Sequence, residues 1–492
     1  MQTIDENEAI YDNVHGFVKI TKDEKKIINS IYFQRLREIK QLSFSYYVFP
    51  GAVHTRFSHS IGVLSVMTKI LERLKETNPE YIRASEEKKL RMAALLHDIG
   101  HYPYSHMIEH VYKDDVIRLQ VEHDDDIQDI SGETNVKKAS AKTDEILKTE
   151  GHHEKLGAYI IQHTNFTGGI TQILREGHFS KNEIRDIALI IQGKSPTTWY
   201  NQVIHSDLDA DRIDYLLRDG TATGAKYGTF DFDYLIKHCR LVPKDQGEGY
   251  YFAIQSSAVF TIEHFLLARY FWYAQIVYER TTLIFDRMGR DFFSWLIQNG
   301  LAYNYIDVVK CVSDPYKFFK FNDNYLWEKV FEIIDKKDEK SYNSLPKFNE
   351  YYELAKMLLE RKPLTRKEIP VVKTLKYSEL FCTAEEVCAN DRSCKNFERC
   401  PKAFEEKFHS VVDQVKKECD KSREELVWVK EEFNKCNIFK LPGTRDKEEV
   451  ERDLIHILEK NGKTTTLMDQ PHSIIPLLGK YELLIPRIYT NL

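Results

Sequence analysis

The strongest constraint on the fold is an apolar pattern of helical period in a chain that holds few helix breakers. Within residues 60–76 the apolar side chains recur every three or four positions, and residues 87–97 become continuously apolar before a histidine. Such spacing places one stripe of apolar side chains on one face of a helix. Only 21 glycines and 14 prolines interrupt the 492 residues. The sequence therefore predicts a mostly α fold.

Strand signals are sparse beside these helices. The run YYVF at 46–49 and a hairpin near 240–254, with DQGEG as its turn, have the composition of strands. Residues 256–290 are rich in aromatics and predict one or two long helices, and residues 300–380 predict further helices. The overall expectation is a helical fold with one minor β-hairpin.

The chain is long enough for more than one domain. We expect an N-terminal domain over residues 1–290 and a C-terminal helical domain over residues 291–492. Residues 112–150 are polar and almost without aromatics, which predicts a surface insertion. A mobile flap or an assembly contact near the site is the alternative for this segment.

The charge and hydropathy of the chain restrict its partners. A formal net charge of -6 argues against a general basic binder of nucleic acid, although it is compatible with a local basic pocket for a small anion. No run approaches the roughly 18 apolar residues that a membrane span needs. The N-terminus is polar and acidic, unlike a secretory signal. We therefore expect a cytoplasmic protein without a membrane partner.

One motif carries the chemistry of a metal site. In AALLHDIGHYPYSH an apolar helix delivers adjacent His97 and Asp98 from its end, and Gly100 then permits a change of chain direction. His101 and His106 follow within a few residues. Imidazole and carboxylate ligands together suit a divalent ion such as Mn, Mg, Fe or Ni. A chance His-Asp pair is the alternative, so the case depends on the accompanying motifs.

Two further motifs add residues of the same kind. HTRFSHSIGV places Arg56 and His59 just before a helix, and HSDLDADRIDYLLRD packs five acids and two arginines into fifteen positions. In the second motif Asp207, Asp211 and Asp214 fall at i, i+4 and i+7, on one face of a helix. Like charges this close repel one another unless a cation or an arginine compensates them. A solvated acidic face is the alternative, but the apolar residues between the acids indicate partial burial.

These motifs, in this order, resemble those of the HD-domain deoxynucleoside triphosphate triphosphohydrolases, which include the bacterial dGTPases and a form fused to a sterile-alpha-motif domain. The resemblance begins at HGFVKI and runs through FQRLREIKQLSFSYYVFPGAVHTRFSHSIGV, LLHDIGHYPYSH, GHHEKLGAYII and LDADRIDYLLRD. It continues weakly to about residue 290 and so covers somewhat over half of the chain. It implies an HD-type helical fold and metal-dependent hydrolysis of a deoxynucleoside triphosphate to deoxynucleoside and triphosphate. The family commonly forms multimers, so a homo-oligomer is also implied.

The resemblance implies a role for individual residues. The implied metal ligands are His59, His97, Asp98 and Asp211. The residues implied at the reacting phosphate are His101, His106, His153 and a supporting Asp209. The implied substrate contacts are Gln41, Arg56, Arg212, Tyr215, Asp219 and Arg269. Among these, Arg56 would contact the phosphates, whereas Gln41, Tyr215 and Asp219 would surround the sugar, where the family reads the 3′-hydroxyl.

The residue types suit this chemistry independently of the resemblance. A bound divalent ion lowers the pKa of water toward neutrality, and arginines offset the charge that develops on a phosphate. Histidines titrate near pH 7 and can protonate a leaving oxygen.

The match departs from the family in ARYFWYAQIVYERTT. The family's tyrosine position holds Val277, its histidine position holds Glu279, and Arg280 replaces a lysine. Tyr278 is displaced by one residue, which turns a helical side chain by about 100°. The departure puts base and sugar preference in doubt. It leaves open an HD hydrolase of another nucleotide or phosphodiester (a nucleotidase, phosphodiesterase or nuclease) and a nucleotide-sensing regulatory module.

Four cysteines repeat at intervals of six residues, namely Cys382, Cys388, Cys394 and Cys400. Such a group suggests a soft metal, and we expect a structural zinc rather than an iron–sulfur cluster. The spacing is not that of a C-x2-C knuckle, so free cysteines are the alternative. The lysines and arginines beside them suggest a partner or nucleic-acid contact, with a solvated basic face as the alternative.

Overall fold

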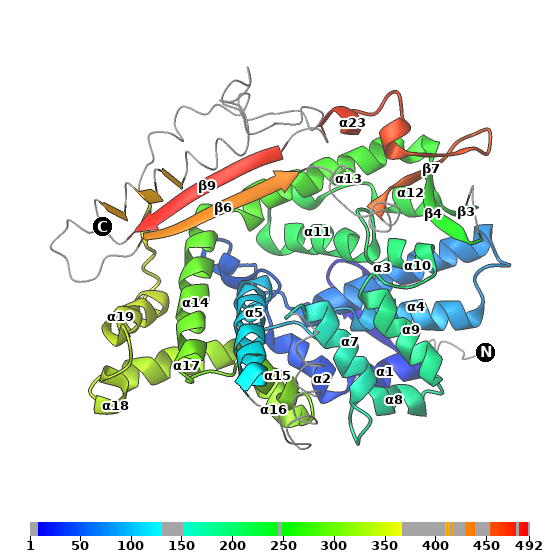
Figure 1. The fold of residues 1–492 in the computed structure, drawn as a ribbon. Coiled ribbons are helices and arrows are strands. Elements are labelled where there is room, and N and C mark those ends of the chain that lie inside the picture. Colours follow the sequence, from blue (N-terminus) through cyan, green and yellow to red (C-terminus); the bar gives the residue numbers. More distant parts are fainter. Residues whose placement is uncertain are drawn as a thin grey trace.

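Helices dominate the computed structural model (Figure 1), which confirms the predicted mostly α fold. The structure describes residues 8–129, 151–244, 248–366, 409–410, 412–413, 416–417, 429–437, 453–478 and 482–490. The cysteine group at 382–400 lies outside these residues, so the zinc site stays a prediction.

The helices that carry the site pack around α3 (Arg56–Thr77). Helices α4 (Ala84–Leu96) and α11 (Ala210–Thr223) lie against α3, and α9 (Lys181–Ile191) lies against both α4 and α7 (His153–His163) (Figure 1). Side chains of α11 lie directly against the α3 backbone at Gly62, where an added Cβ would lie 1.9 Å from the Asp214 carboxylate. This contact brings two charged segments of the sequence to one place.

Shorter helices complete the N-terminal part. They are α1 (Lys22–Ile28), α2 (Ile31–Gln34), α8 (Ile170–Glu176), α10 (Thr198–Gln202) and α12 (Phe232–Lys237), with the single-turn helices η1 (Arg35–Glu38), η2 (Ser43–Tyr47), η3 (Lys226–Gly228) and η4 (Ser256–Ala258). Several of these helices have an N-cap side chain that accepts a hydrogen bond from a backbone amide of the first turn. In α1, for example, the Thr21 hydroxyl accepts from the Glu24 amide at 3.2 Å.

The segment 256–290 forms two helices, as predicted. They are α13 (Val259–Trp272) and α14 (Arg280–Gln298), with a π-helical turn η5 (Tyr273–Val277) between them. The domain boundary predicted at residue 290 falls inside α14. The helices that follow are α15 (Tyr305–Cys311), α16 (Pro315–Lys320), α17 (Asp323–Asp335), α18 (Lys340–Asn343) and α19 (Phe348–Leu359).

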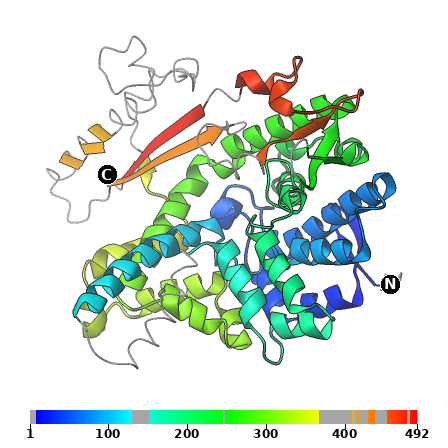
Figure 2. The same ribbon diagram turned by 45° about the vertical axis from the view of Figure 1, so that its right-hand side comes forward.

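These later helices share the core of the N-terminal part. The buried Asp323 carboxylate accepts from the backbone amides of Lys40, at 3.0 Å, and Tyr104, at 2.7 Å. The buried Arg35 donates from Nε to the Phe321 carbonyl at 2.7 Å. Figure 2 shows α14 and the yellow-green helices 305–359 against the cyan α5 (His106–Asp129).

In the part of the chain that the structure describes, three small sheets lie at the edges of the helical mass. The hairpin of β1 (Ala9–Asp12) and β2 (Gly16–Lys19) is antiparallel. The predicted hairpin is confirmed as β3 (Cys239–Pro243) with β4 (Tyr250–Gln255), antiparallel with Leu241 opposite Phe252. This sheet continues with β7 (His456–Leu458), parallel to β4, and β8 (Thr464–Thr466), followed by η9 (Leu467–Asp469) and α23 (Ile475–Leu478).

The third sheet corrects the expectation of a purely helical C-terminal domain. It has the order β5 (Thr365–Arg366), β9 (Glu482–Thr490) and β6 (Val429–Asn437), all antiparallel. Strands β6 and β9 run side by side beyond the ends of the helices in Figures 1 and 2. The helical prediction is confirmed for the described residues up to Leu359 and is wrong for these strands.

The predicted strand 46–49 is also wrong, because residues 43–47 form η2 and no neighbouring strand pairs with them. The aromatic residues of this run pack against a helix instead, since the Tyr47 ring lies 4.7 Å from that of Phe285 on α14. Aromatic runs favour strands only where a sheet is present to receive them.

The polar segment 112–150 begins inside helix α5. Tyr112 and Val116 are buried, and the buried Asp115 carboxylate accepts from the Tyr305 amide at 2.8 Å. The first residues of the predicted insertion therefore belong to the core. Helix α5 continues to Asp129, where the described part of this segment ends.

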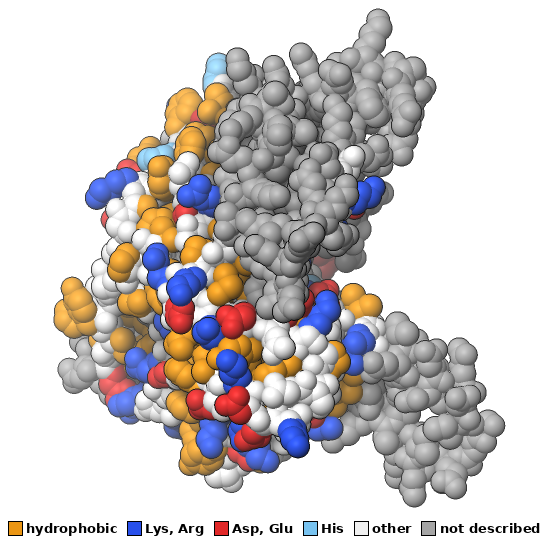
Figure 3. All heavy atoms as spheres, turned by 90° about the vertical axis from the view of Figure 1, so that its left-hand side faces the viewer, with side chains coloured by type: hydrophobic (Ala, Val, Ile, Leu, Met, Phe, Trp, Pro, Cys, Tyr) orange, Lys and Arg blue, Asp and Glu red, His pale blue; other side chains and the backbone are white. Residues whose placement is uncertain are grey.

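The surface that carries α17–α19 mixes charges of both signs with apolar side chains (Figure 3). Short-range ion pairs such as Lys329–Glu332, at 2.8 Å, occur on α17. Among the described residues, no helix is both long and apolar enough to cross a bilayer.

Candidate active site

A cavity of about 330 Å³ opens between α4, α7, α11 and the α13–α14 connection. Of the residues predicted for the site, it is lined by Gln41, Arg56, His97, Asp98, His106, His153, Asp209, Asp211, Arg212, Tyr215 and Asp219. Residues from five distant segments of the sequence thus meet in one place. His59 and His101 are fully buried and contact lining residues from behind, whereas Arg269 is turned to another partner.

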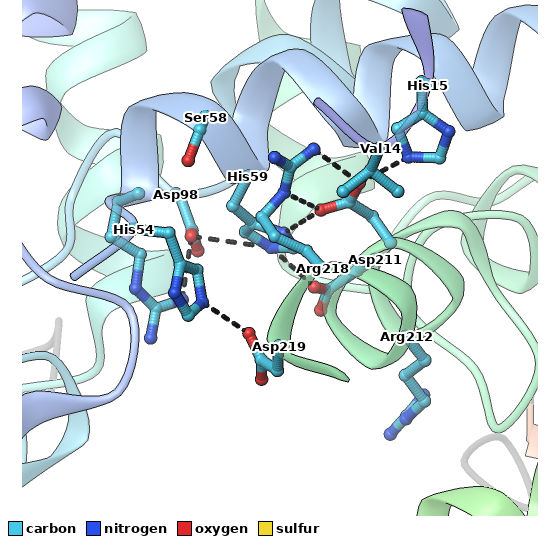
Figure 4. A network of polar contacts seen from close by, with 12 residues as sticks. Val14, His15, His54, Ser58, His59, Asp98, Asp211, Arg212, Arg218 and Asp219 are labelled. Carbon is cyan, nitrogen blue, oxygen red and sulfur yellow. Dashed lines mark hydrogen bonds and ion pairs between the residues drawn. The ribbon is translucent and has the colours of Figure 1, made fainter. Parts of the chain in front are cut away.

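The predicted metal ligands converge on a small volume. His59 Nε2 lies 2.9 Å from Asp211 Oδ1 and 3.2 Å from His97 Nε2. Asp98 Oδ1 lies 3.4 Å from His97 Nε2, and Asp98 Oδ2 lies 3.8 Å from His59 Nε2 (Figure 4). Neighbouring ligands of a six-coordinate ion with bonds of about 2.1 Å are about 3 Å apart. His59, His97 and Asp211 therefore form a group that could hold one divalent ion, and Asp98 lies beside it.

The hydrogen bonds of the two Nδ1 atoms determine which ring nitrogen of His59 and of His97 faces the space between the predicted ligands. His59 Nδ1 donates to Asp214 Oδ2 at 2.7 Å, and His97 Nδ1 donates to the Ala94 carbonyl at 2.9 Å. Both Nε2 lone pairs consequently point toward each other, which is repulsive unless positive charge lies between them. Burial lowers the pKa of His59, but the Asp211 and Asp214 hydrogen bonds outweigh it and raise this pKa to about 10. The site therefore favours a cation, and outer carboxylates that orient metal-bound histidines are typical of metal sites.

Local structure explains part of this arrangement. The sequence places Arg56 and His59 before a helix, and this expectation is wrong, because both lie in the first turn of α3. The helix starts at Thr55, whose amide donates to Ser58 Oγ at 3.3 Å. Likewise α11 begins at Ala210, so Asp211 lies in its first turn and Asp214 follows three positions later on the helix, while Asp207 lies in the preceding loop.

Gly100 has a different role from the one the sequence suggested. It is not among the glycines with positive φ. Instead an added Cβ would lie 2.3 Å from both the Gly157 amide nitrogen and the His153 carbonyl oxygen. Close packing of the segment 97–101 against α7 therefore requires glycine, and it brings His153 to the site.

Three histidines lie together beside the metal ligands. The rings of His101 and His153 stack with centroids 4.1 Å apart, and the His106 ring lies 5.0 Å from that of His101. Asp98 Oδ1 lies 4.0 Å from Nε2 of both His101 and His153. The buried Glu109 joins them, because its carboxylate accepts from His106 Nδ1 at 2.7 Å and His153 Nδ1 at 3.1 Å.

The two buried histidines of this group differ in charge. Burial and the nearby Arg56 charge lower the pKa of His101 well below its usual value, so His101 is neutral. Burial also lowers the pKa of His153, but the charges of Glu154 and Glu109 outweigh it and raise this pKa to about 9. One neutral and one protonated imidazole therefore lie in contact, which is a suitable pair for moving a proton.

The arginines of the cavity are held by carboxylates. Arg56 donates to Asp98 Oδ2 at 2.8 Å and to Ser105 Oγ at 2.9 Å. Arg212 donates from Nη1 to Asp209 Oδ2 at 2.9 Å, and burial raises the pKa of Asp209 to about 6 against the charge of Arg212. Both guanidinium groups are thus fixed at the cavity wall, where they can face an anion.

Arg269 does not line the cavity. Its guanidinium donates to the Asp207 carbonyl at 3.0 Å and to the Asp207 carboxylate at 3.3 Å. It ties α13 to the loop before α11, and its predicted contact with substrate stays a prediction.

The residues predicted around the sugar offer free polar atoms. Gln41 Oε1, Tyr215 OH and Asp219 Oδ2 are buried and have no hydrogen-bond partner among the described residues. The Tyr215 ring stacks on Trp272 at 4.8 Å, which fixes its direction. Buried polar atoms without partners are costly, so three of them on one cavity wall indicate that a ligand satisfies them.

The segment in which the sequence departs from the family contains the π-helical turn. Tyr273 and Val277 line the cavity, and Glu279 does not. Glu279 is instead the N-cap of α14, where its carboxylate accepts from the Thr282 amide at 2.8 Å. The Glu279 carboxylate is therefore occupied at the helix terminus and does not face the cavity.

Sequence reasoning assigned no role to Asp214, Glu109, His15 and His54. Glu109 follows His106 by three positions on one helix, and that spacing is a signal that could have identified it. Asp214 was noted among the clustered acids, but only the fold shows that it holds His59 and accepts from His15 Nε2 at 2.6 Å.

Comparison with known proteins agrees with this geometry. Residues 56–219 match the family profile of the HD domain. It is 29% identical over 326 residues to an uncharacterized protein of Methanocaldococcus jannaschii, which is 65% of this chain and 57% of the relative. It is 44% identical over 107 residues to the deoxynucleoside triphosphate triphosphohydrolase SAMHD1 of Bos taurus, which is 21% of this chain and 18% of the relative.

The chain thus spans little more than half the length of the first curated relatives that it matches. Two solved structures share its fold over nearly their full lengths. A hypothetical protein from Aquifex aeolicus has a TM-score of 0.63 at 24% identity, covering 98% of this chain and 96% of that one. A phosphohydrolase from Bacteroides thetaiotaomicron has a TM-score of 0.61 at 22% identity, covering 98% of both chains.

Proposed function

We propose that this HD-domain protein hydrolyses deoxynucleoside triphosphates to a deoxynucleoside and inorganic triphosphate, with a divalent ion bound by His59, His97, Asp98 and Asp211. The observation that carries the proposal is the cavity itself, where these four side chains adjoin three histidines, two arginines and a wall of unpartnered polar atoms. Metal ligands and arginines suit a polyphosphate, and the polar wall suits a sugar. The SAMHD1 relatives carry the same activity in their name.

Each residue of the chain has a task in this proposal. When bound, Mn, Mg, Fe or Ni would polarise a phosphoryl oxygen and make water acidic enough to react near neutral pH. Arg56 and Arg212 would neutralise phosphate charge. The protonated His153, with His101 and His106 beside it, would donate a proton to the oxygen that leaves with the deoxynucleoside. Asp209 would hold Arg212 in place.

Product identification tests the proposal against its nearest alternative. Purified protein incubated with each deoxynucleoside triphosphate and Mn²⁺ or Mg²⁺ should release deoxynucleoside and triphosphate in equal amounts. Release of orthophosphate, pyrophosphate or a nucleoside monophosphate would assign another phosphohydrolase reaction. If no nucleotide is turned over with any divalent ion, the proposal is lost. Light scattering in the same buffers tests the proposed homo-oligomer, which a persistent monomer would contradict.

Glu109→Gln should separate proton transfer from metal binding. The amide removes the charge that orients His106 and His153 through Nδ1, so kcat should fall about 10- to 100-fold. Metal content measured by elemental analysis should stay at the wild-type value, because Glu109 lies outside the ligand set. Asp233→Asn, an exposed acid on α12, is the matched control and should leave both values unchanged. An unchanged kcat in the Glu109 variant would contradict the assigned role.

A further inference from the structure

His54 is a half-buried histidine that has no role in the proposed reaction. It lies just before α3, and its Nε2 donates to Asp219 Oδ1 at 2.6 Å (Figure 4). The Asp219 side chain is only 1% exposed, and that of His54 is 10% exposed. Asp219 lines the cavity and His54 does not. The histidine therefore acts on the cavity through the carboxylate.

The backbone of His54 holds a second residue of the same wall. Its carbonyl accepts from the Gln41 amide at 3.0 Å. This bond belongs to a short antiparallel pairing of residues 39–41 with 54–56, in which Lys40 is opposite Thr55 and the Arg56 amide donates to the Ile39 carbonyl at 2.9 Å. One residue thus connects Gln41, from the N-terminal segment, with Asp219, from the far end of α11.

The remaining oxygens of these two side chains lack a partner. Asp219 Oδ2 and Gln41 Oε1 are buried hydrogen-bond acceptors, and Tyr215 OH beside them can donate or accept. An imidazole N–H on Oδ1 prevents the carboxylate from rotating, so Oδ2 keeps one direction. The fixed Asp219 acceptor, the Gln41 amide oxygen and the phenol together match a ligand hydroxyl that donates one hydrogen bond and accepts another.

We infer that His54 is a positioning residue for sugar recognition, which holds Asp219 and Gln41 so that together they read the 3′-hydroxyl of a deoxynucleoside triphosphate. The inference rests on the proposed function and names a residue outside the cavity that sets its specificity. His54 has no contact with the reacting phosphate. Its loss therefore changes the preference for a hydroxylated sugar and leaves the metal site intact.

The test compares a deoxynucleoside triphosphate with its 2′,3′-dideoxy analogue, which lacks only the 3′-hydroxyl. Wild-type protein should favour the hydroxylated nucleotide in kcat/KM by about tenfold or more, because the analogue leaves buried acceptors unpaired. His54→Ala and His54→Phe should bring this ratio close to 1. His54→Gln, which returns an N–H donor near the position of Nε2, should restore part of it. His163→Ala, at an exposed histidine stacked on Tyr159, should keep the wild-type ratio.

The outcomes separate this inference from the proposed function. If wild-type protein turns over no nucleotide, the proposed function fails, and the ratio of dissociation constants for the two nucleotides, measured by calorimetry, tests His54 instead. If His54→Ala loses activity equally on both nucleotides, His54 is merely structural and the inference is overturned. If His54→Ala does not fold, His54→Phe, which keeps a ring in the same space, decides by the same ratio.

Discussion

Asp211→Ala should abolish both metal binding and hydrolysis while the protein stays folded. Asp211 Oδ1 lies 2.9 Å from His59 Nε2 in the group that also contains His97, and its side chain is 35% exposed toward the cavity. Loss of an outer partner of a metal ligand typically costs about 10- to 100-fold in affinity or activity, and loss of a ligand itself should exceed that. We expect Mn²⁺ affinity and kcat each to fall more than 100-fold.

Elemental analysis after equilibrium dialysis measures the metal, and triphosphate release measures the activity. His97→Ala should behave in the same way, because its Nε2 lies 3.2 Å from that of His59. Asp233→Asn again serves as the control. A chain that binds a stoichiometric divalent ion without Asp211, yet still hydrolyses nucleotide, would remove the metal assignment.

Arg218→Met should lower the free energy of unfolding far more than any surface substitution does. The Arg218 side chain is 1% exposed and forms two hydrogen bonds to Asp214, at 2.8 and 3.0 Å, and two to Asp12, at 2.8 and 3.1 Å. Burial raises the pKa of Asp214, but Arg218 and the hydrogen bonds from His15 and His59 hold it well below its usual value, so Asp214 stays charged. Removing one partner of a buried charge pair costs about 3–5 kcal/mol.

Urea denaturation followed by circular dichroism measures this free energy of unfolding. Lys336→Met introduces the same side chain at an exposed ion pair with Glu339 and should leave the free energy of unfolding nearly unchanged. Metal affinity of the Arg218 variant should also fall, because Asp214 would no longer be held where it accepts from His59 Nδ1. Equal stability of the two variants would show that the network adds nothing to the fold.

Local sequence signals predicted the long helices well, and for a physical reason. The apolar periodicity of α3 and α4 records which face of each helix is buried, and this information is local to the helix. The run at 46–49 failed because a strand needs a neighbour, and the neighbour that residues 43–47 find is the helix α14. The strands β6 and β9, more than 40 residues apart in sequence, escaped detection because their pairing is not local.

The proposed metal ligands could be named from the sequence because their residue types and order are specific. The residues that orient the site could not be named, because nothing in the local sequence distinguishes Asp214, Glu109 and His54 from other acids and histidines. Their roles arise only when the helices pack. The distance between Asp219 and His54 is 165 positions along the chain and 2.6 Å in space. Such pairs depend on the crossing of α3 and α11, which no local pattern specifies.

The sequence by itself determined the helical class of this protein and named the residues that we propose as metal ligands, because periodicity and ligand chemistry are properties of neighbouring positions. Only the tertiary structure decided how those residues are oriented. It oriented the His59 and His97 imidazoles by an acceptor at Nδ1, turned Arg269 and Glu279 away from the cavity, and left Gln41, Tyr215 and Asp219 facing it with unpaired atoms. Orientation depends on contacts between distant segments, and those contacts exist only in the folded chain.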